Sequence, residues 1–170
     1  MIYLSDNWET FTHNGKTYAA RLERDETHSA PWIEECEHGP ITGWERRDKA
    51  PGELVLVEDR GLACFYDFQE ACRIARREGW NAKPYDVPGE TKRQRAAKAA
   101  RADYERMRQW CDDIWFYVGV IVAPVCPCCS EIDESESRSL WGIESDAGDY
   151  LQEVARELAD EIGSEKAQAA

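Results

Sequence analysis

This sequence has no hydrophobic run long enough to span a membrane. Its longest apolar stretch starts at Ile114 and extends to Cys126, well short of the roughly 18 consecutive apolar residues of a transmembrane helix. The first residues, MIYLSDNWE, also lack the basic segment and the apolar segment of a secretory signal peptide. We therefore expect no membrane partner and a cytoplasmic location.

Recognisable catalytic motifs are missing as well. There are three histidines, at positions 13, 28 and 38, and none belongs to a Ser-His-Asp or Cys-His pattern with a recognisable nucleophile. No glycine-rich phosphate-binding loop follows any expected strand. We expect no enzymatic activity and no cofactor. An active site assembled from the loop over residues 28–49 is the alternative that these absences leave open.

The cysteines are odd in number and unevenly spaced. Seven occur in the chain, and this pattern favours a reducing, intracellular compartment over a disulfide framework. Three of them stand together in Cys126-Pro127-Cys128-Cys129, and with His38 they could form a Cys/His zinc site. Interpreted as C-x-C-C, this spacing departs from the usual pattern of zinc ligands, so a surface loop with adjacent thiols is the favoured interpretation. A small zinc-binding module is the alternative.

The composition predicts a folded protein. Of the 170 residues 42% are hydrophobic, and seven Trp, seven Tyr and four Phe are present, which is more aromatic content than disordered chains carry. The length suits a single domain with a sizeable core. We expect one domain over residues 1–163 and a flexible C-terminal tail over residues 164–170.

Local patterns predict an α+β fold in which a single antiparallel sheet has helices packed on it. Asn14-Gly15 is a strong signal for a type I′ hairpin turn, and it would place Phe11 opposite Tyr18. Asp67 is suited to cap a helix, and the continuous apolar run over residues 115–123 predicts a central strand. The expected order is ββ-ββ-α-α-β-β-α, with strands at 8–13, 16–22, 53–57 and 62–66, helices at 67–79 and 91–113, strands at 115–123 and 138–144, and a helix at 147–162.

The loop over residues 25–52 is long for a compact domain and contains two tryptophans, Trp32 and Trp44. Tryptophan buries a large apolar area when it packs, so we expect an ordered loop in which at least one of the two is largely buried. Trp44, Arg46 and Arg47 are its candidate binding residues. A loop clamped on the edge of the sheet without a ligand is the favoured alternative.

Charge is sorted along the chain. Residues 73–108 have eleven Lys/Arg against five Asp/Glu, whereas residues 126–170 have three Lys/Arg against twelve Asp/Glu. Such sorting bears on partners rather than on fold. The favoured role for the basic helix 92–108 is a solvated face balanced by the acidic region, because a net charge of −13 would repel a polyanion. A nucleic-acid interface there is the alternative, and it would use Arg93, Arg95, Lys98, Arg101, Arg106 and Arg108.

The acidic region predicts a protein partner that has a basic surface. Asp149, Glu153, Glu157 and Glu161 recur every four residues, which gives a ridge of carboxylates about 6 Å apart on a helix. Duplex DNA has one charge per roughly 1.7 Å of axis, so this ridge alone is too sparse to mimic it and would need help from the preceding loop. For this ridge, an ordinary solvent-exposed helix face is the favoured interpretation over mimicry of nucleic acid. The candidate partner-binding residues are Glu131, Asp133, Glu134, Glu136, Asp149, Glu153 and Glu157.

Four segments resemble small uncharacterised proteins encoded by tailed phages and prophages of proteobacteria. They are EHGPITGW (37–44), ERRDKAPGE (45–53), FYDFQEACRIARREGW (65–80) and SLWGIESD (139–146). The resemblance covers most of the chain, and it implies no catalytic residue because that family has no settled activity. It implies a small, acidic phage product made inside a bacterial host, where such proteins often bind and block a host enzyme or defence complex.

These patterns together predict a non-enzymatic, phage-type accessory protein in the cytoplasm of the bacterial host. It would bind a host protein that has a basic surface through its acidic face, and could act as a nucleic-acid mimic or an inhibitor. We do not expect it to bind nucleic acid directly. The alternatives are a nucleic-acid-binding module that uses the basic helix and a small zinc-binding module.

Overall fold

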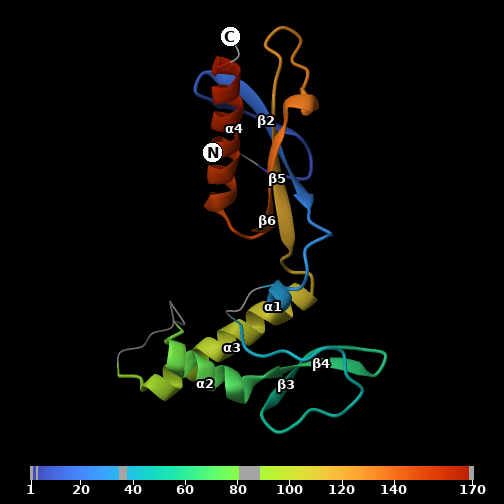
Figure 1. Cartoon of the computed structure of the whole chain (residues 1–170), viewed down its shortest axis with the longest axis vertical. Coiled ribbons are helices and arrows are strands. Elements are labelled where there is room, and N and C mark those ends of the chain that lie inside the picture. Colours follow the sequence, from blue (N-terminus) through green and yellow to red (C-terminus); the bar gives the residue numbers. More distant parts are fainter. Residues whose placement is uncertain (1, 3, 35–37, 81–88, 169–170) are drawn as a thin grey trace. The chain divides into compact units, whose positions relative to one another are not determined.

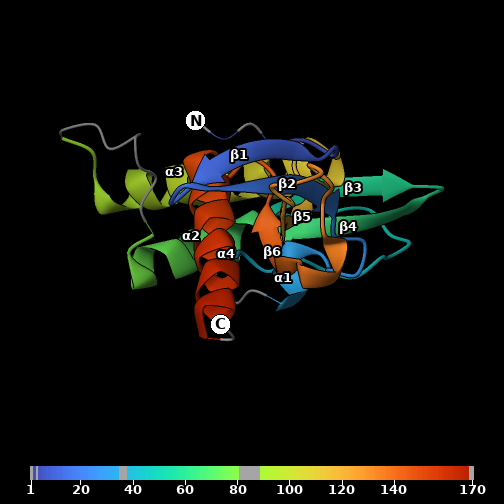
Figure 2. The same ribbon diagram turned by 90° about the horizontal axis from the view of Figure 1, so that it is seen from above.

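The computed structural model describes residues 2, 4–34, 38–80 and 89–168, and it contains two compact units (Figure 1, Figure 2). Unit 1 comprises Met1–His28 and Trp115–Ala170, and unit 2 comprises Ser29–Ile114. The predicted α+β class, antiparallel pairing and order of elements are confirmed. The strands form two sheets rather than one, because the first hairpin pairs with the buried strand that follows Trp115 and not with the second hairpin.

The sheet of unit 1 has four antiparallel strands in the order β1-β2-β5-β6. Asn14 and Gly15 both have positive φ, 48° and 74°, as the type I′ turn requires, and Phe11 pairs with Tyr18 as predicted. β5 lies between β2 and β6, which confirms its predicted internal position. The strands are β1 (Glu9–His13), β2 (Lys16–Arg24), β5 (Tyr117–Pro124) and β6 (Arg138–Glu144).

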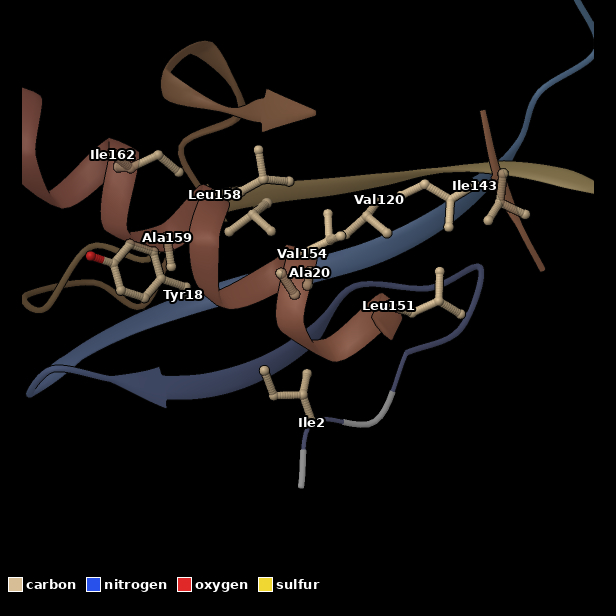
Figure 3. Packing of buried hydrophobic residues seen from close by; sticks show 13 residues of the cluster. Ile2, Tyr18, Ala20, Val120, Ile143, Leu151, Val154, Leu158, Ala159 and Ile162 are labelled. Carbon is tan, nitrogen blue, oxygen red and sulfur yellow. The ribbon is translucent and has the colours of Figure 1, made fainter. Parts of the chain in front are cut away.

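Helix α4 (Asp149–Gln168) covers one face of this sheet and supplies six of the thirteen buried residues in the core cluster of unit 1. Figure 3 shows its apolar side chains directed at those of β2 and β5. Burying a valine, leucine or isoleucine side chain contributes roughly 1.5–3 kcal/mol. The apolar stripe of α4 therefore holds this helix on the sheet. The buried residues of the stripe are Leu151, Val154, Ala155, Leu158, Ala159 and Ile162.

The sequence predicted that α4 ends before Gly163, and this prediction is wrong because the helix continues to Gln168. A Cβ at Gly163 would lie 3.2 Å from the hydroxyl oxygen of Tyr18. The glycine therefore permits close packing of the helix against β2 and does not act as a helix stop. The expected C-terminal tail is helical over residues 164–168, and residues 169–170 lie outside the described part of the chain.

Unit 2 packs a two-stranded sheet against two helices. β4 runs directly into α2, and α3 packs on both α2 and β3. The largest side chains that are fully buried in this unit are Leu56, Phe65, Tyr66 and Met107. The elements are α1 (Pro31–Glu34), β3 (Glu53–Asp59), β4 (Leu62–Asp67), α2 (Phe68–Glu78) and α3 (Lys92–Cys111).

Both longer helices of unit 2 begin at side-chain caps. The Asp67 carboxylate accepts a hydrogen bond from the backbone N–H of Glu70 at 2.8 Å, as predicted, and Gly79 ends α2 with φ 75°. Thr91 and Gln94 form a capping box at the start of α3. Residues 81–88, between α2 and α3, lie outside the described part of the chain.

The longest helices, α3 and α4, have 20 residues each. Within the part of the chain that the structure describes, no helix is both long enough and apolar enough to cross a membrane.

Candidate functional site

The acidity of the protein is concentrated in unit 1. This unit has six Lys/Arg against seventeen Asp/Glu, a net charge of −11, whereas unit 2 has fifteen against seventeen, a net charge of −2. The seven predicted partner-binding carboxylates all belong to unit 1, all are exposed, and none forms an ion pair within the described residues. We refer to these seven residues, Glu131, Asp133, Glu134, Glu136, Asp149, Glu153 and Glu157, as the acidic surface.

Two of the six cations of unit 1 are engaged away from the acidic surface. Arg21 pairs with Glu23 at 3.1 Å and lies 4.8 Å above the ring of Trp8, and Arg24 lies 4.4 Å above the ring of Phe116. These two guanidinium groups are held by strand neighbours and aromatic rings, so neither forms an ion pair with the acidic surface.

The structure does not bring all seven carboxylates to one point. A cavity of about 330 Å³ is lined by Pro127 of the β5–β6 loop and by Ile162 of α4, so the loop lies beside the C-terminal end of the helix. Asp149 begins the helix thirteen residues earlier, which is about 20 Å at 1.5 Å per residue. The acidic surface is therefore an extended strip along unit 1 rather than a compact cluster.

Asp160 is a residue of this helix to which the sequence assigned no role. Its carboxylate accepts a hydrogen bond from the Asn14 side chain at 2.9 Å and lies 2.8 Å from Nε2 of His13. These bonds tie the helix to the turn between β1 and β2. No local signal in the sequence points to a pairing across 147 residues, so only the fold reveals it.

The basic helix α3 does not present its cations as one ridge. Lys98 pairs with Glu90, Arg108 lies 3.5 Å from Asp112, and Arg101 is stacked over the rings of Phe68 and Tyr104. Of the six predicted nucleic-acid contacts, Arg93, Arg95 and Arg101 are exposed, and Lys98, Arg106 and Arg108 are half-buried. The ion pairs observed for this helix are made with carboxylates of unit 2, whereas the sequence suggested a balance with the acidic C-terminal region.

The described part of the 28–49 loop is clamped on the edge of the small sheet. Ile41 and Glu45 pair with Tyr66 and Ala63 of β4, in agreement with the favoured alternative for this loop. Trp44, a candidate binding residue, is 53% exposed. Trp32 is half-buried edge-on against Trp110 at 5.2 Å, so the loop buries less aromatic surface than expected.

The guanidinium group of Arg47 is bonded within this loop and its neighbouring strand, so it stabilises the structure and is not free to bind a ligand. Its Nη1 and Nη2 donate to the two carboxylate oxygens of Glu53 at 2.7 and 2.8 Å, its Nε donates to Glu45, and it lies 4.2 Å above the ring of Phe65. The hydrogen bonds from Arg47 lower the pKa of Glu53, and the backbone N–H of Ala50 lowers it further. Arg46 is exposed, and nothing in its surroundings assigns it a ligand.

His38 and Asp103 form a half-buried polar pair that the sequence did not reveal. Asp103 Oδ1 lies 2.6 Å from His38 Nδ1, and Asp103 Oδ2 accepts hydrogen bonds from the Gly39 N–H at 2.8 Å and the Tyr66 hydroxyl at 2.6 Å. Burial raises the pKa of Tyr66, and the bond to Asp103 raises it further. A Cβ at Gly39 would lie 2.5 Å from the Tyr66 ring, so only glycine fits there. With both oxygens bonded, this carboxylate joins the loop to α3.

The three thiols of the β5–β6 loop come together. The sulfurs of Cys126, Cys128 and Cys129 all lie within 4.8 Å of one another, and those of Cys126 and Cys128 are 2.9 Å apart. Hydrogen bonds from the Cys128 thiol and from the backbone N–H groups of residues 128 and 129 lower the pKa of Cys126 to about 7. Cys128, in turn, has its pKa raised by Cys126.

His38, the fourth ligand of the zinc alternative, belongs to unit 2, where its Nδ1 is held by Asp103. The group of possible metal ligands found among the described residues comprises the three thiols. Cys36, two residues before His38 in the sequence, lies outside the described residues.

Comparisons with protein-family models, with curated proteins and with solved structures found no match for this chain.

Proposed function

We propose that this protein is a non-enzymatic binding protein whose unit 1 binds a basic surface of another protein. The observation that carries the proposal is the set of seven exposed carboxylates that have no cationic partner within the described residues. In a phage setting, which the resemblance of four sequence segments suggests, the partner would be a host protein or defence complex.

The extended strip of carboxylates favours a partner with spaced cations over one with a single deep pocket. Along α4, Glu153 and Glu157 are one helical turn apart, about 6 Å, which suits lysine or arginine side chains on a helix or groove of the partner. Exposed pairs of this kind contribute little individually. Their combined field accelerates association and makes it sensitive to salt.

Nucleic-acid binding by α3 is the weaker candidate. Stacking and ion pairing within unit 2 use Lys98, Arg101 and Arg108, which leaves fewer cations to track a phosphate backbone than a nucleic-acid helix needs. Gel-shift titration with single-stranded and duplex probes tests this candidate, and we expect no shift at near-physiological salt.

Affinity capture from a bacterial lysate tests the main proposal. The full chain would be used at about 0.1 M and about 1 M salt, where the Debye length is roughly 10 Å and 3 Å. We expect a discrete partner at low salt that is lost at high salt. A double variant, Glu153→Gln with Glu157→Gln, should lose it at both.

A charge-matched control separates the acidic surface from net charge. Glu58→Gln with Glu105→Gln removes two exposed carboxylates from unit 2 and should leave capture unchanged. Equal loss in both double variants would show that only net charge matters, and capture that ignores both salt and the unit 1 variant would refute the proposal.

A further inference from the structure

The three clustered thiols of unit 1 serve neither its core nor the acidic surface. Cys126 is half-buried, and Cys128 and Cys129 are exposed. The other described cysteines, Cys64, Cys72 and Cys111, are buried or half-buried in unit 2, where cysteine behaves as a small apolar residue. Three accessible sulfurs within reach of a common point are a different arrangement, and they call for a chemical explanation.

The spacing of these cysteines matches metal ligands better than the sequence interpretation allowed. Cys126 and Cys129 are separated by two residues, Pro127 and Cys128, which is the C-x2-C separation of structural zinc sites. Cys128 supplies a third sulfur within the same turn. The C-x-C-C spacing describes neighbouring thiols, whereas the C-x2-C separation belongs to the outer pair.

Backbone hydrogen bonds hold this turn in place. The Cys126 N–H donates to the Glu131 carbonyl at 2.8 Å, and the Ser130 N–H donates to the Cys126 carbonyl at 2.9 Å. Ser130 has φ 62°, a left-handed conformation that reverses the chain directly after Cys129. Val125 and Ile132 pair as a β-bridge below the turn. The loop is therefore closed by its own backbone, and the thiols sit on a preformed support.

The distances suit one thiophilic ion. Sulfurs bound to zinc at about 2.3 Å in a tetrahedral arrangement lie about 3.8 Å from each other, and the three sulfurs here lie within 4.8 Å of one another. Rotation of the two exposed side chains would bring them to that spacing. Exposure also leaves the fourth position open, and the Glu131 carboxylate, which accepts from the Cys129 thiol at 3.5 Å, adds negative charge nearby.

We infer that Cys126, Cys128 and Cys129 form a surface site for one soft metal ion of the zinc class, held by three thiolates with a fourth position open to an external ligand. Thiolate sulfur selects such ions over magnesium and calcium. Because the loop is closed without the ion, the site would take up and release metal without unfolding unit 1. This inference is independent of partner binding by the acidic surface.

Cobalt and zinc titration of the reduced full chain tests the inference. Under a non-coordinating reductant and without oxygen, Co²⁺ should produce a thiolate-to-metal charge-transfer absorption that saturates at one ion per chain, and Zn²⁺ should abolish it. Each of Cys126→Ser, Cys128→Ser and Cys129→Ser should weaken binding by more than the roughly 10–100-fold typical of losing an outer-shell partner. The melting temperature of the metal-free variants should match that of the metal-free wild type.

Cys72→Ala is the matched control, because it removes a thiol of unit 2 and leaves the loop intact. It should bind cobalt as the wild type does. Absence of the charge-transfer band in the reduced wild type would overturn the inference and leave a redox-active thiol group as the explanation. Wild-type binding by Cys128→Ser would overturn the three-thiol assignment, and loss of binding in Cys72→Ala would place the metal elsewhere.

Discussion

The two units of this protein contain similar numbers of residues, but they differ in how their charged side chains are paired. In unit 2, several arginines and lysines are matched by carboxylates or aromatic rings of the same unit, as in the contacts of Arg47, Lys98 and Arg101. In unit 1, carboxylates outnumber cations by seventeen to six, and the acidic surface has no cationic partner within the described residues. Charge in unit 2 thus contributes to its structure, whereas charge in unit 1 is a surplus.

The excess of negative charge lowers the stability of unit 1. Like charges one helical turn apart destabilise a helix by about 0.2–0.5 kcal/mol per pair, and excess charge of one sign opposes a compact state. The core under α4 offsets this cost by burying Leu151, Val154, Leu158 and Ile162. The fold of unit 1 does not need the acidic surface, which favours a role for this surface in binding a partner.

The largest expected effect is loss of the packing that offsets this repulsion. Leu158→Ala removes a buried side chain of α4 and should lower the free energy of unfolding by about 2–5 kcal/mol. Denaturant unfolding followed by circular dichroism measures this. Leu140→Ala on β6 is the control, because Leu140 is 42% exposed, and it should change stability by less than about 0.5 kcal/mol. Equal effects would contradict the described core.

A second comparison concerns carboxylates that are used structurally in each unit. Asp103→Ala in unit 2 leaves the buried Gly39 N–H without its acceptor, whereas the Tyr66 hydroxyl keeps the Ala100 carbonyl at 3.1 Å as a second acceptor. A buried unsatisfied polar group costs about 1–3 kcal/mol, and we expect a loss in that range. Asp160→Ala in unit 1 removes a side chain that is 58% exposed and should cost less than about 1 kcal/mol. A larger loss for Asp160→Ala would reverse this ranking.

Acid should weaken the pairing in unit 2. Arg47 lowers the pKa of Glu53, so the folded state favours the ionised carboxylate. The resulting stabilisation is present above the ordinary glutamate pKa of about 4.3 and is lost as pH falls through the lowered value. The stability difference between wild type and Glu53→Gln should therefore shrink on acidification below about pH 4. Urea unfolding at several pH values measures it, and a difference that grows in acid would contradict the described pairing.

The smallest expected effect is a gain. Glu153→Gln removes the repulsion of Glu153 with Asp149 and with Glu157, and it should stabilise unit 1 by about 0.4–1 kcal/mol at low salt. The gain should fade at high salt, because exposed charges are screened. Thermal melts at two salt concentrations test this, with Glu58→Gln on unit 2 as the control. Destabilisation by Glu153→Gln would mean that the carboxylate has a structural partner.

Local signals in the sequence were sufficient for most elements. Asn14-Gly15 fixed the first hairpin and its register, Asp67 and Gly79 bounded α2, and the apolar run of β5 predicted its place between two neighbours. Each of these depends on residues close together in the chain. The predicted end of α4 before Gly163 was wrong, because glycine occurs at sites of close packing as well as at helix ends.

Features that depend on distant residues could not be found in this way. His38 and Asp103 are 65 residues apart, and nothing local to either predicts their bond. The division into two sheets depends on which strands pair with β5. A single sequence does not specify that pairing. The exposure of the acidic surface followed from helical periodicity, but its spread along unit 1 needed the position of the β5–β6 loop beside the end of α4.

The central claim, that the unpaired carboxylates of unit 1 bind a basic partner, is tested most directly by an association rate. Stopped-flow measurement would use the captured partner with wild type and with a four-site variant, Glu131→Gln, Glu134→Gln, Glu153→Gln and Glu157→Gln. For wild type, we predict a rate constant that falls at least about tenfold between 0.1 M and 1 M salt, as steered encounters do. The variant should start near the high-salt value and change little. A rate constant that is the same for both proteins and at both salt concentrations would contradict the claim.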